Sequence, residues 1–215
     1  MLPDSAGEGA GGVGVRGESA TIYLGLLAAG LAAGRASARK ANSLGALCRW
    51  NRAEAAQILC AGIFVLLYAR YGLSGPFFWL AVLSAMLPGL AVMDARTYRI
   101  PNDILLWIGF TGMLRSAAGH IGWRAAGLGC LSGIALFCAL LLVTRGGIGW
   151  GDVKMAGALG IWFGVGGILQ IFVAAFTVAA GVSAILLLTK RKTKKDPIAL
   201  GPYLCMGTLL LVLAG

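Results

Sequence analysis

Charge is what this sequence has least of. Charged residues make up 12% of its 215 positions, against roughly a quarter in ordinary soluble domains. The few charges are clustered, and long apolar runs lie between them. A run of about 18 or more apolar residues is what a bilayer crossing needs. The composition therefore argues against a soluble fold and predicts an all-α, polytopic transmembrane helix bundle in the lipid bilayer.

Histidine is scarce, and closely spaced cysteine pairs are absent from the sequence. His120 is the single histidine, and it falls in a short turn between two apolar segments. The five cysteines form no C-x-x-C pair, so neither a zinc knuckle nor a redox dithiol has its usual spacing. We interpret them as small apolar packing residues, and we expect no metal site and no cofactor. They are Cys48, Cys60, Cys130, Cys138 and Cys205.

The apolar runs define the expected organisation. Residues 1–19 are rich in Gly and acidic side chains and are predicted to form a disordered extension, followed by a transmembrane domain over 20–215. The segment at 153–164 is short for a crossing, so we expect about seven to eight membrane segments. They lie at about residues 21–33, 54–70, 75–93, 103–118, 122–143, 153–164, 165–188 and 198–214.

The basic residues set the expected orientation. With the N-terminus outside, 14 of the 18 Lys and Arg residues fall in inner loops, as the positive-inside rule requires. The net charge of +10 is thereby explained by membrane orientation, and no nucleic-acid partner is expected. The exceptions at outer positions are Arg16, Arg70, Arg115 and Arg124.

Two aspartates enter the same inner face from different helices. Asp94 ends the third apolar run, and Asp152 follows a glycine-rich turn. A single interfacial aspartate usually caps a helix or pairs with Arg, and Asp103 keeps that interpretation. Two carboxylates can instead share one proton, so that the ionised member activates water while the protonated member polarises a peptide carbonyl. Nucleophilic Ser–His or Cys–His chemistry is disfavoured, because His120 is predicted on the opposite side.

The flanking residues resemble a known family. The stretch from Asp94 to Ile100-Pro101-Asn102 resembles the first motif of the type IV prepilin peptidases, and Gly149-Trp150-Gly151-Asp152-Val153-Lys154 resembles their G-x-G-D motif. Ala199-Leu200-Gly201-Pro202-Tyr203-Leu204 is similar to their Pro-Phe-Gly-Pro-Phe region, with Ala199 and Leu200 in place of Pro and Phe. The resemblance covers about Ala55 to the C-terminus. It implies Asp94 and Asp152 as the catalytic pair, with Gly149, Gly151, Lys154, Pro101 and Asn102 shaping the site or contacting substrate.

The resemblance implies an aspartyl endopeptidase of the bacterial cytoplasmic membrane. Its partner would be a prepilin or pseudopilin, whose short basic leader is removed at the cytosolic membrane boundary. Longer members carry a cytosolic insertion with two C-x-x-C pairs and also N-methylate the product. Here the loop over 35–53 is short and holds only Cys48, so a structural zinc is not expected and methylation is left open. The layout resembles the compact members that serve Flp-type, Tad or Gram-positive competence pili.

Alternatives remain at this level. The same G-x-G-D chemistry occurs in preflagellin-type and signal-peptide-peptidase-like proteases, and paired carboxylates also bind cations in ion-coupled transporters. Lys154 is more simply interpreted as a head-group anchor than as a substrate contact. The sequence leaves open whether the chain forms a homodimer.

Overall fold

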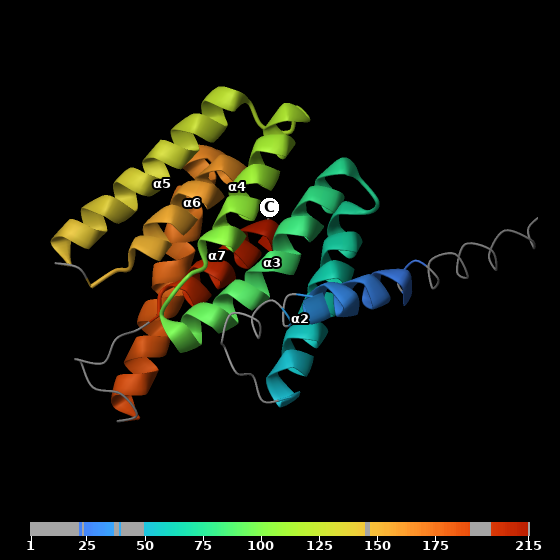
Figure 1. Ribbon diagram of the computed structural model, residues 1–215, viewed down its shortest axis with the longest axis horizontal. Coiled ribbons are helices and arrows are strands. Elements are labelled where there is room, and N and C mark those ends of the chain that lie inside the picture. Colours follow the sequence, from blue (N-terminus) through green and yellow to red (C-terminus); the bar gives the residue numbers. More distant parts are fainter. Residues whose placement is uncertain are drawn as a thin grey trace, which may run out of the picture.

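The protein is a bundle of helices (Figure 1). The computed structural model describes residues 22, 24–36, 39, 50–144, 147–189 and 199–214, and all regular structure within these ranges is helical. The predicted extension at 1–19 lies outside the described residues. An apolar helix, Leu24–Ala36, precedes α2 (Trp50–Tyr71), α3 (Gly75–Thr97), α4 (Asn102–Ala117), α5 (Trp123–Val143), α6 (Trp150–Leu188) and α7 (Gly201–Ala214).

Three of the described helices are long and apolar enough to cross a membrane: Gly75–Thr97, Trp123–Val143 and Trp150–Ile185. Large apolar side chains point outward from the bundle, such as Leu131 and Leu142 on α5. Such a surface suits lipid, where a helix also satisfies its own backbone hydrogen bonds. The prediction of an all-α membrane bundle is confirmed.

Helix α6 consists of two segments that meet at Gly164. This residue has φ 67° and ψ −171°, a conformation that in practice only glycine adopts. The predicted boundary between segments 153–164 and 165–188 is therefore confirmed. We call the segment at 150–163 α6a and the segment at 165–188 α6b.

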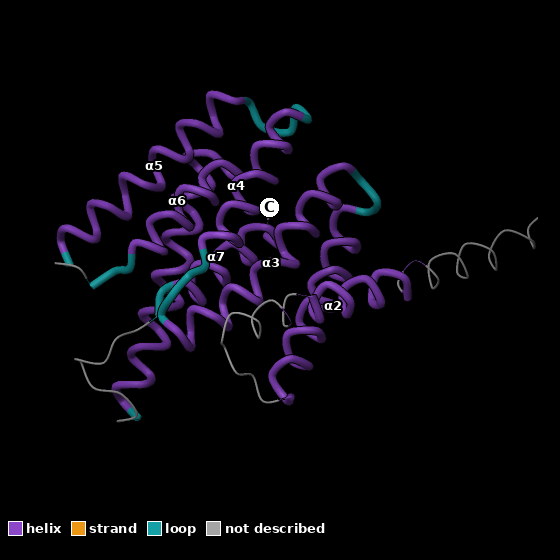
Figure 2. Tube along the Cα trace, in the orientation of Figure 1, coloured by secondary structure: helices purple, strands orange, loops and turns teal. Residues whose placement is uncertain are grey.

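The chain reverses direction at Gly164, as the contacts with α5 show. Gly133 lies against Ala156 and Gly129 against Gly160, so α5 and α6a are antiparallel. Further along, the rings of Phe137 and Phe172 meet edge to face with centroids 5.9 Å apart. Since Gly129 also lies against Gly164, α6b runs in the same direction as α5. In the tube view the two segments of α6 lie beside α5 (Figure 2).

An arginine covers the carbonyl end of α6a. The Nη1 of Arg115 donates to the backbone oxygen of Trp162, and its guanidinium lies 5.7 Å from the centre of the Trp162 ring. The indole Nε1 of Trp162 in turn donates to the oxygen of Ile108 at 2.7 Å. The last carbonyls of a helix lack partners and attract cations, so Arg115 stabilises the end that Gly164 interrupts.

Helix α6a lies at the centre of the bundle. A Cβ atom at Gly160 would lie 2.8 Å from the backbone nitrogen of Cys130, and one at Gly133 would lie 2.8 Å from the carbonyl carbon of Ala156. Small residues of this kind let membrane helices pack with their backbones in close approach. The fully buried side chains around α6a include Leu83, Leu87, Leu90, Ile108, Phe137, Met155, Leu159, Trp162, Ile168, Ile171 and Leu204.

The two ends of the bundle differ. One end, which we call the aspartate end, collects the last turn of α3 and the first turns of α4, α6a and α7, where Gly201 lies against Asp94. At the opposite end Arg70 donates through Nη2 to the oxygen of Ala214 at 2.7 Å, and the ring of His120 packs on Trp79 with centroids 6.2 Å apart. His120 and the two aspartates are thus far apart, as the sequence predicted.

The close packing of α5 on α6a can be tested with Gly160→Ala. The added methyl would collide with the backbone of α5 near Gly129, so we expect a loss of about 1–3 kcal/mol of stability. For a chain of this size that corresponds to a fall of about 2–12 °C in Tm, measured by thermal unfolding in detergent. Gly166→Ala is the control, because a Cβ there meets nothing within 4 Å. Equal Tm values for the two variants would contradict the packing argument.

Candidate active site

Asp94 lies in the last turn of α3, and its side chain is only 5% exposed. The helix ends there because Tyr98 adopts a left-handed conformation, φ 51° and ψ 29°, and its N–H donates to the Asp94 backbone oxygen. The Asp94 carboxylate accepts a hydrogen bond at Oδ2 from the N–H of Gly201, 2.9 Å away. Gly201 is the first residue of α7, where N–H groups have no partner within the helix. Asp94 therefore caps α7 from a neighbouring helix.

Asp152 lies in the first turn of α6a and is 7% exposed. Its Oδ2 accepts a hydrogen bond from the N–H of Gly149 at 3.3 Å. Its Oδ1 is buried and has no hydrogen-bond partner among the described residues. The first turn of a helix favours a negative charge, so the glycine-rich turn and the helix start together hold this carboxylate in place.

Both aspartates line one pocket of about 280 Å³, and their charges interact. Two carboxylates buried in the same small space favour a single shared proton over two full charges. Within the described residues no group of three or more His, Cys, Asp or Glu side chains is positioned to hold a metal ion. The rest of the pocket wall comes from Tyr98, Arg99, Ile100, Asn102, Gly149, Trp150, Gly151 and Lys154.

The two predicted glycines shape this wall. A Cβ at Gly149 would lie 3.5 Å from Oδ2 of Asp152, and one at Gly151 would lie 3.1 Å from the Cβ of Ile100. The first turn of α6a thus passes close to the loop that follows α3. A side chain at Gly151 would push these two segments apart.

Lys154 and Asn102 form a polar contact at the rim of the pocket. The Nζ of Lys154 donates to Oδ1 of Asn102 at 3.0 Å, which joins α6a to the first residue of α4. Lys154 is therefore directed toward a site residue, and the head-group anchor favoured by its position in the sequence stays a prediction.

The remaining residues of the first motif lie beside the pocket. Pro101 is the N-cap of α4, with φ −64° and ψ 131°, and lines a neighbouring cavity of about 590 Å³. Asp103 lies in the first turn of α4, where its charge suits the helix dipole. The N-cap position itself is occupied by Pro101, and Asp103 lies at the helix start where the sequence placed it.

Gly201 is the functional residue that sequence reasoning did not single out. A Cβ at this position would lie 2.6 Å from Oδ2 of Asp94, so only glycine allows the contact. The similarity of residues 199–204 to a family region was the available signal. It did not show that this segment, 107 residues further along the chain, reaches Asp94.

The similarity of this chain to known proteins covers the segment that holds both aspartates. Residues 81–185, which include both aspartates, match the type IV leader peptidase family. The chain is 30% identical over 162 residues to the prepilin leader peptidase/N-methyltransferase of Bacillus subtilis (strain 168), an alignment that covers 75% of this chain and 65% of that protein. Identity to the protein of the same name from Burkholderia pseudomallei (strain K96243) is 32% over 147 residues, covering 65% and 47%.

A third relative of that name, from Escherichia coli (strain K12), is 30% identical over 129 residues, covering 56% of each chain. The chain therefore spans about half to two thirds of the length of the curated relatives it matches. No solved structure matches it. Both aspartates lie inside the segment that matches the type IV leader peptidase family, and the chain is similar to the prepilin leader peptidase/N-methyltransferases over that segment.

Proposed function

We propose that this chain is an aspartic-type endopeptidase that removes the leader from a prepilin or pseudopilin. Asp94 and Asp152 are its catalytic pair, and residues 20–215 form the peptidase domain. The observation that carries the proposal is the shared pocket: two buried carboxylates from separate motifs meet at the ends of α3 and α6a. The names of the relatives, prepilin leader peptidase/N-methyltransferase, support this substrate class.

The geometry suits hydrolysis by a proton-sharing pair. One carboxylate accepts a proton from a water molecule as the water oxygen attacks the scissile carbonyl carbon. The other carboxyl donates its proton to the carbonyl oxygen. The tetrahedral intermediate then collapses and the C–N bond breaks. The leaving amine takes up a proton from one carboxyl, and a hydroxyl of the intermediate returns a proton to the other carboxylate, so the pair again holds one proton. The two carboxyl groups titrate together, so the proton belongs to the pair.

The hydrogen bonds of the pair support a proposal for which oxygens react. Gly201 donates to one oxygen of Asp94, and Gly149 donates to one oxygen of Asp152. The oxygen of Asp152 that has no partner among the described residues is Oδ1. We assign Oδ1 to the water molecule or to the shared proton.

The orientation proposed for the membrane follows the connecting segments. The connections at the aspartate end, residues 98–101, 144–149 and 189–200, hold Arg99, Arg145, Lys190, Arg191, Lys192, Lys194 and Lys195. The connections at the opposite end, 72–74 and 118–122, hold no Lys or Arg. The positive-inside rule then directs the aspartate end to the cytosol, where a basic leader stays.

The catalytic pair is tested by Asp94→Asn and Asp152→Asn. Asn keeps an oxygen that can accept from Gly201 or Gly149 but cannot exchange protons, so cleavage of a co-expressed prepilin is expected to fall by at least about 10²-fold. Mass spectrometry of the prepilin N-terminus measures the cut and reports any methyl group. Asp103→Asn is the matched control and should cleave as the unchanged chain does. Retained cleavage in either of the first two variants would overturn the assignment.

The role of Gly201 is tested by Gly201→Ala. The added Cβ would displace the Asp94 carboxylate, so kcat is expected to fall by about tenfold or more, equivalent to about 1.4 kcal/mol, with KM little changed. Gly62→Ala is the control, because a Cβ at Gly62 meets nothing within 4 Å. A rise in KM at constant kcat would show that Gly201 acts on substrate binding instead of positioning Asp94.

A further inference from the structure

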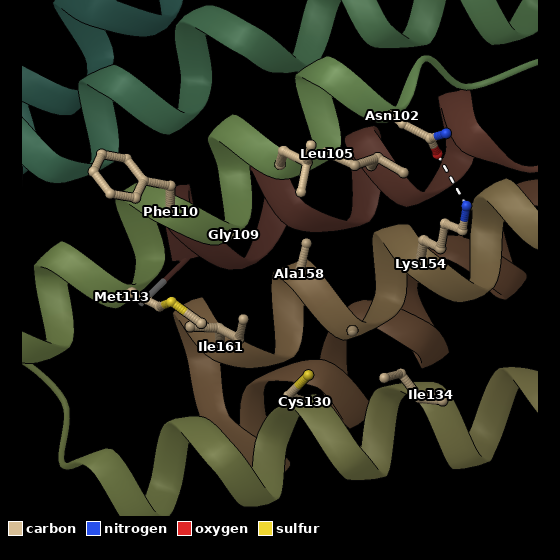
Figure 3. A pocket seen from close by; sticks show the side chains of 12 residues that line it. Asn102, Leu105, Gly109, Phe110, Met113, Cys130, Ile134, Lys154, Ala158 and Ile161 are labelled. Carbon is tan, nitrogen blue, oxygen red and sulfur yellow. Dashed lines mark hydrogen bonds between the residues drawn. The ribbon is translucent and has the colours of Figure 1, made fainter.

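An apolar groove of about 690 Å³ runs along the outside of α6a, between α4 and α5. Figure 3 shows its walls: Leu105, Phe110 and Met113 project from α4, Cys130 and Ile134 from α5, and Ile161 from α6a. The volume lies within the range of about 300–1,000 Å³ that is usual for ligand sites. We call this space the α4–α5 groove.

The groove is continuous with the aspartate pocket. Asn102 and Lys154 line both spaces, and their hydrogen bond stands at the boundary between them. From this boundary the groove follows α4 as far as Met113, which is about three helical turns, or roughly 16 Å. A molecule lying in the groove would therefore end beside Asp94 and Asp152.

The lining determines what can occupy the groove. Apart from Asn102 and Lys154 at one end, its side chains are apolar and offer no hydrogen-bond partners. A peptide segment in such surroundings has to satisfy its own backbone as a helix. Gly109 on α4 also leaves room for close approach of another helix, since a Cβ at this position meets nothing within 4 Å.

The chemistry at the boundary fits the point where such a helix would unwind. Cleavage needs an extended peptide at the aspartates, and unwinding frees backbone N–H and C=O groups that require new partners. The amide of Asn102 and the ammonium of Lys154 are the polar groups located there. A helix in the groove would thus pass directly into an extended segment within the aspartate pocket.

We propose that the α4–α5 groove binds the apolar helix of the membrane substrate, next to the bond that is cut. This inference rests on the proposed function. It adds a docking site outside the catalytic pocket, where Gly109 decides whether the helix fits and where Asn102 and Lys154 receive the segment that unwinds.

Gly109→Leu tests the groove by filling it. The bundle tolerates the side chain because the space is open at Gly109. The new leucine side chain then occupies part of the groove that the substrate helix would fill. We expect kcat/KM for a full-length prepilin to fall by about tenfold or more, mainly through KM. Gly127→Leu is the matched control: it adds the same side chain to an open helix position on α5 outside the groove, and it should leave kcat/KM unchanged.

Cross-linking supplies a second readout that does not need catalysis. Cys130 lines the groove and has a free thiol. In the Asp152→Asn variant, a cysteine placed in the first three turns of the prepilin apolar helix is expected to form a disulfide with Cys130 under oxidation. The product should disappear with Cys130→Ser and with Gly109→Leu but persist with Gly127→Leu.

The outcomes separate the groove from the proposed function. Two results would overturn the docking site and leave a lipid acyl chain as the occupant of the groove. One is the absence of the Cys130 cross-link. The other is that Gly109→Leu changes neither the cross-link nor kcat/KM. A cross-link that is lost with Cys130→Ser and Gly109→Leu but kept with Gly127→Leu would support the docking site. If the unchanged chain then showed no cleavage, the peptidase assignment would be overturned.

Discussion

The arrangement of this protein depends on the contact between α6a and α5. At Gly129 and Gly160 the two backbones touch with no side chain between them, so a short helix fits into the middle of the bundle. Side chains of α6a such as Met155, Leu159 and Trp162 are then completely buried against the surrounding helices. Because α6a is held at its centre, its first turn, which carries Asp152, is fixed at one end of the bundle.

The same constraint explains how charged groups come to lie among apolar helices. The centre of the bundle contains helix ends, and each end leaves backbone groups without partners. Arg115 donates to a carbonyl at the end of α6a, and Asp94 accepts from the first N–H of α7. Each charged group therefore makes a hydrogen bond, which lowers the free-energy cost of burying it. For Asp94 that contact also holds the carboxylate in place beside the pocket that it shares with Asp152.

Structure and proposed function are joined along α4 and α6a. Toward the α4–α5 groove these helices present polar residues only where they begin, at Asn102 and Lys154, and apolar or small residues beyond. A substrate with a basic leader and an apolar helix has the same division of polarity at its cleavage junction. The polar pocket with the aspartates and the apolar α4–α5 groove thus correspond to the two halves of the proposed substrate, and the Lys154–Asn102 contact lies where the two halves meet.

The sequence by itself determined the helical segments, the break near residue 164 and the aspartates Asp94 and Asp152. These follow from apolar run length and from local patterns around glycine and proline, which depend on neighbours along the chain. Only the tertiary structure decided that Gly201 holds Asp94, that Arg115 covers the end of α6a, and that Lys154 contacts Asn102. Each of these contacts joins different helices, and their partners depend on the reversal at Gly164 and on how closely glycines let the helices approach. Periodicity along one segment carries no information on that distance.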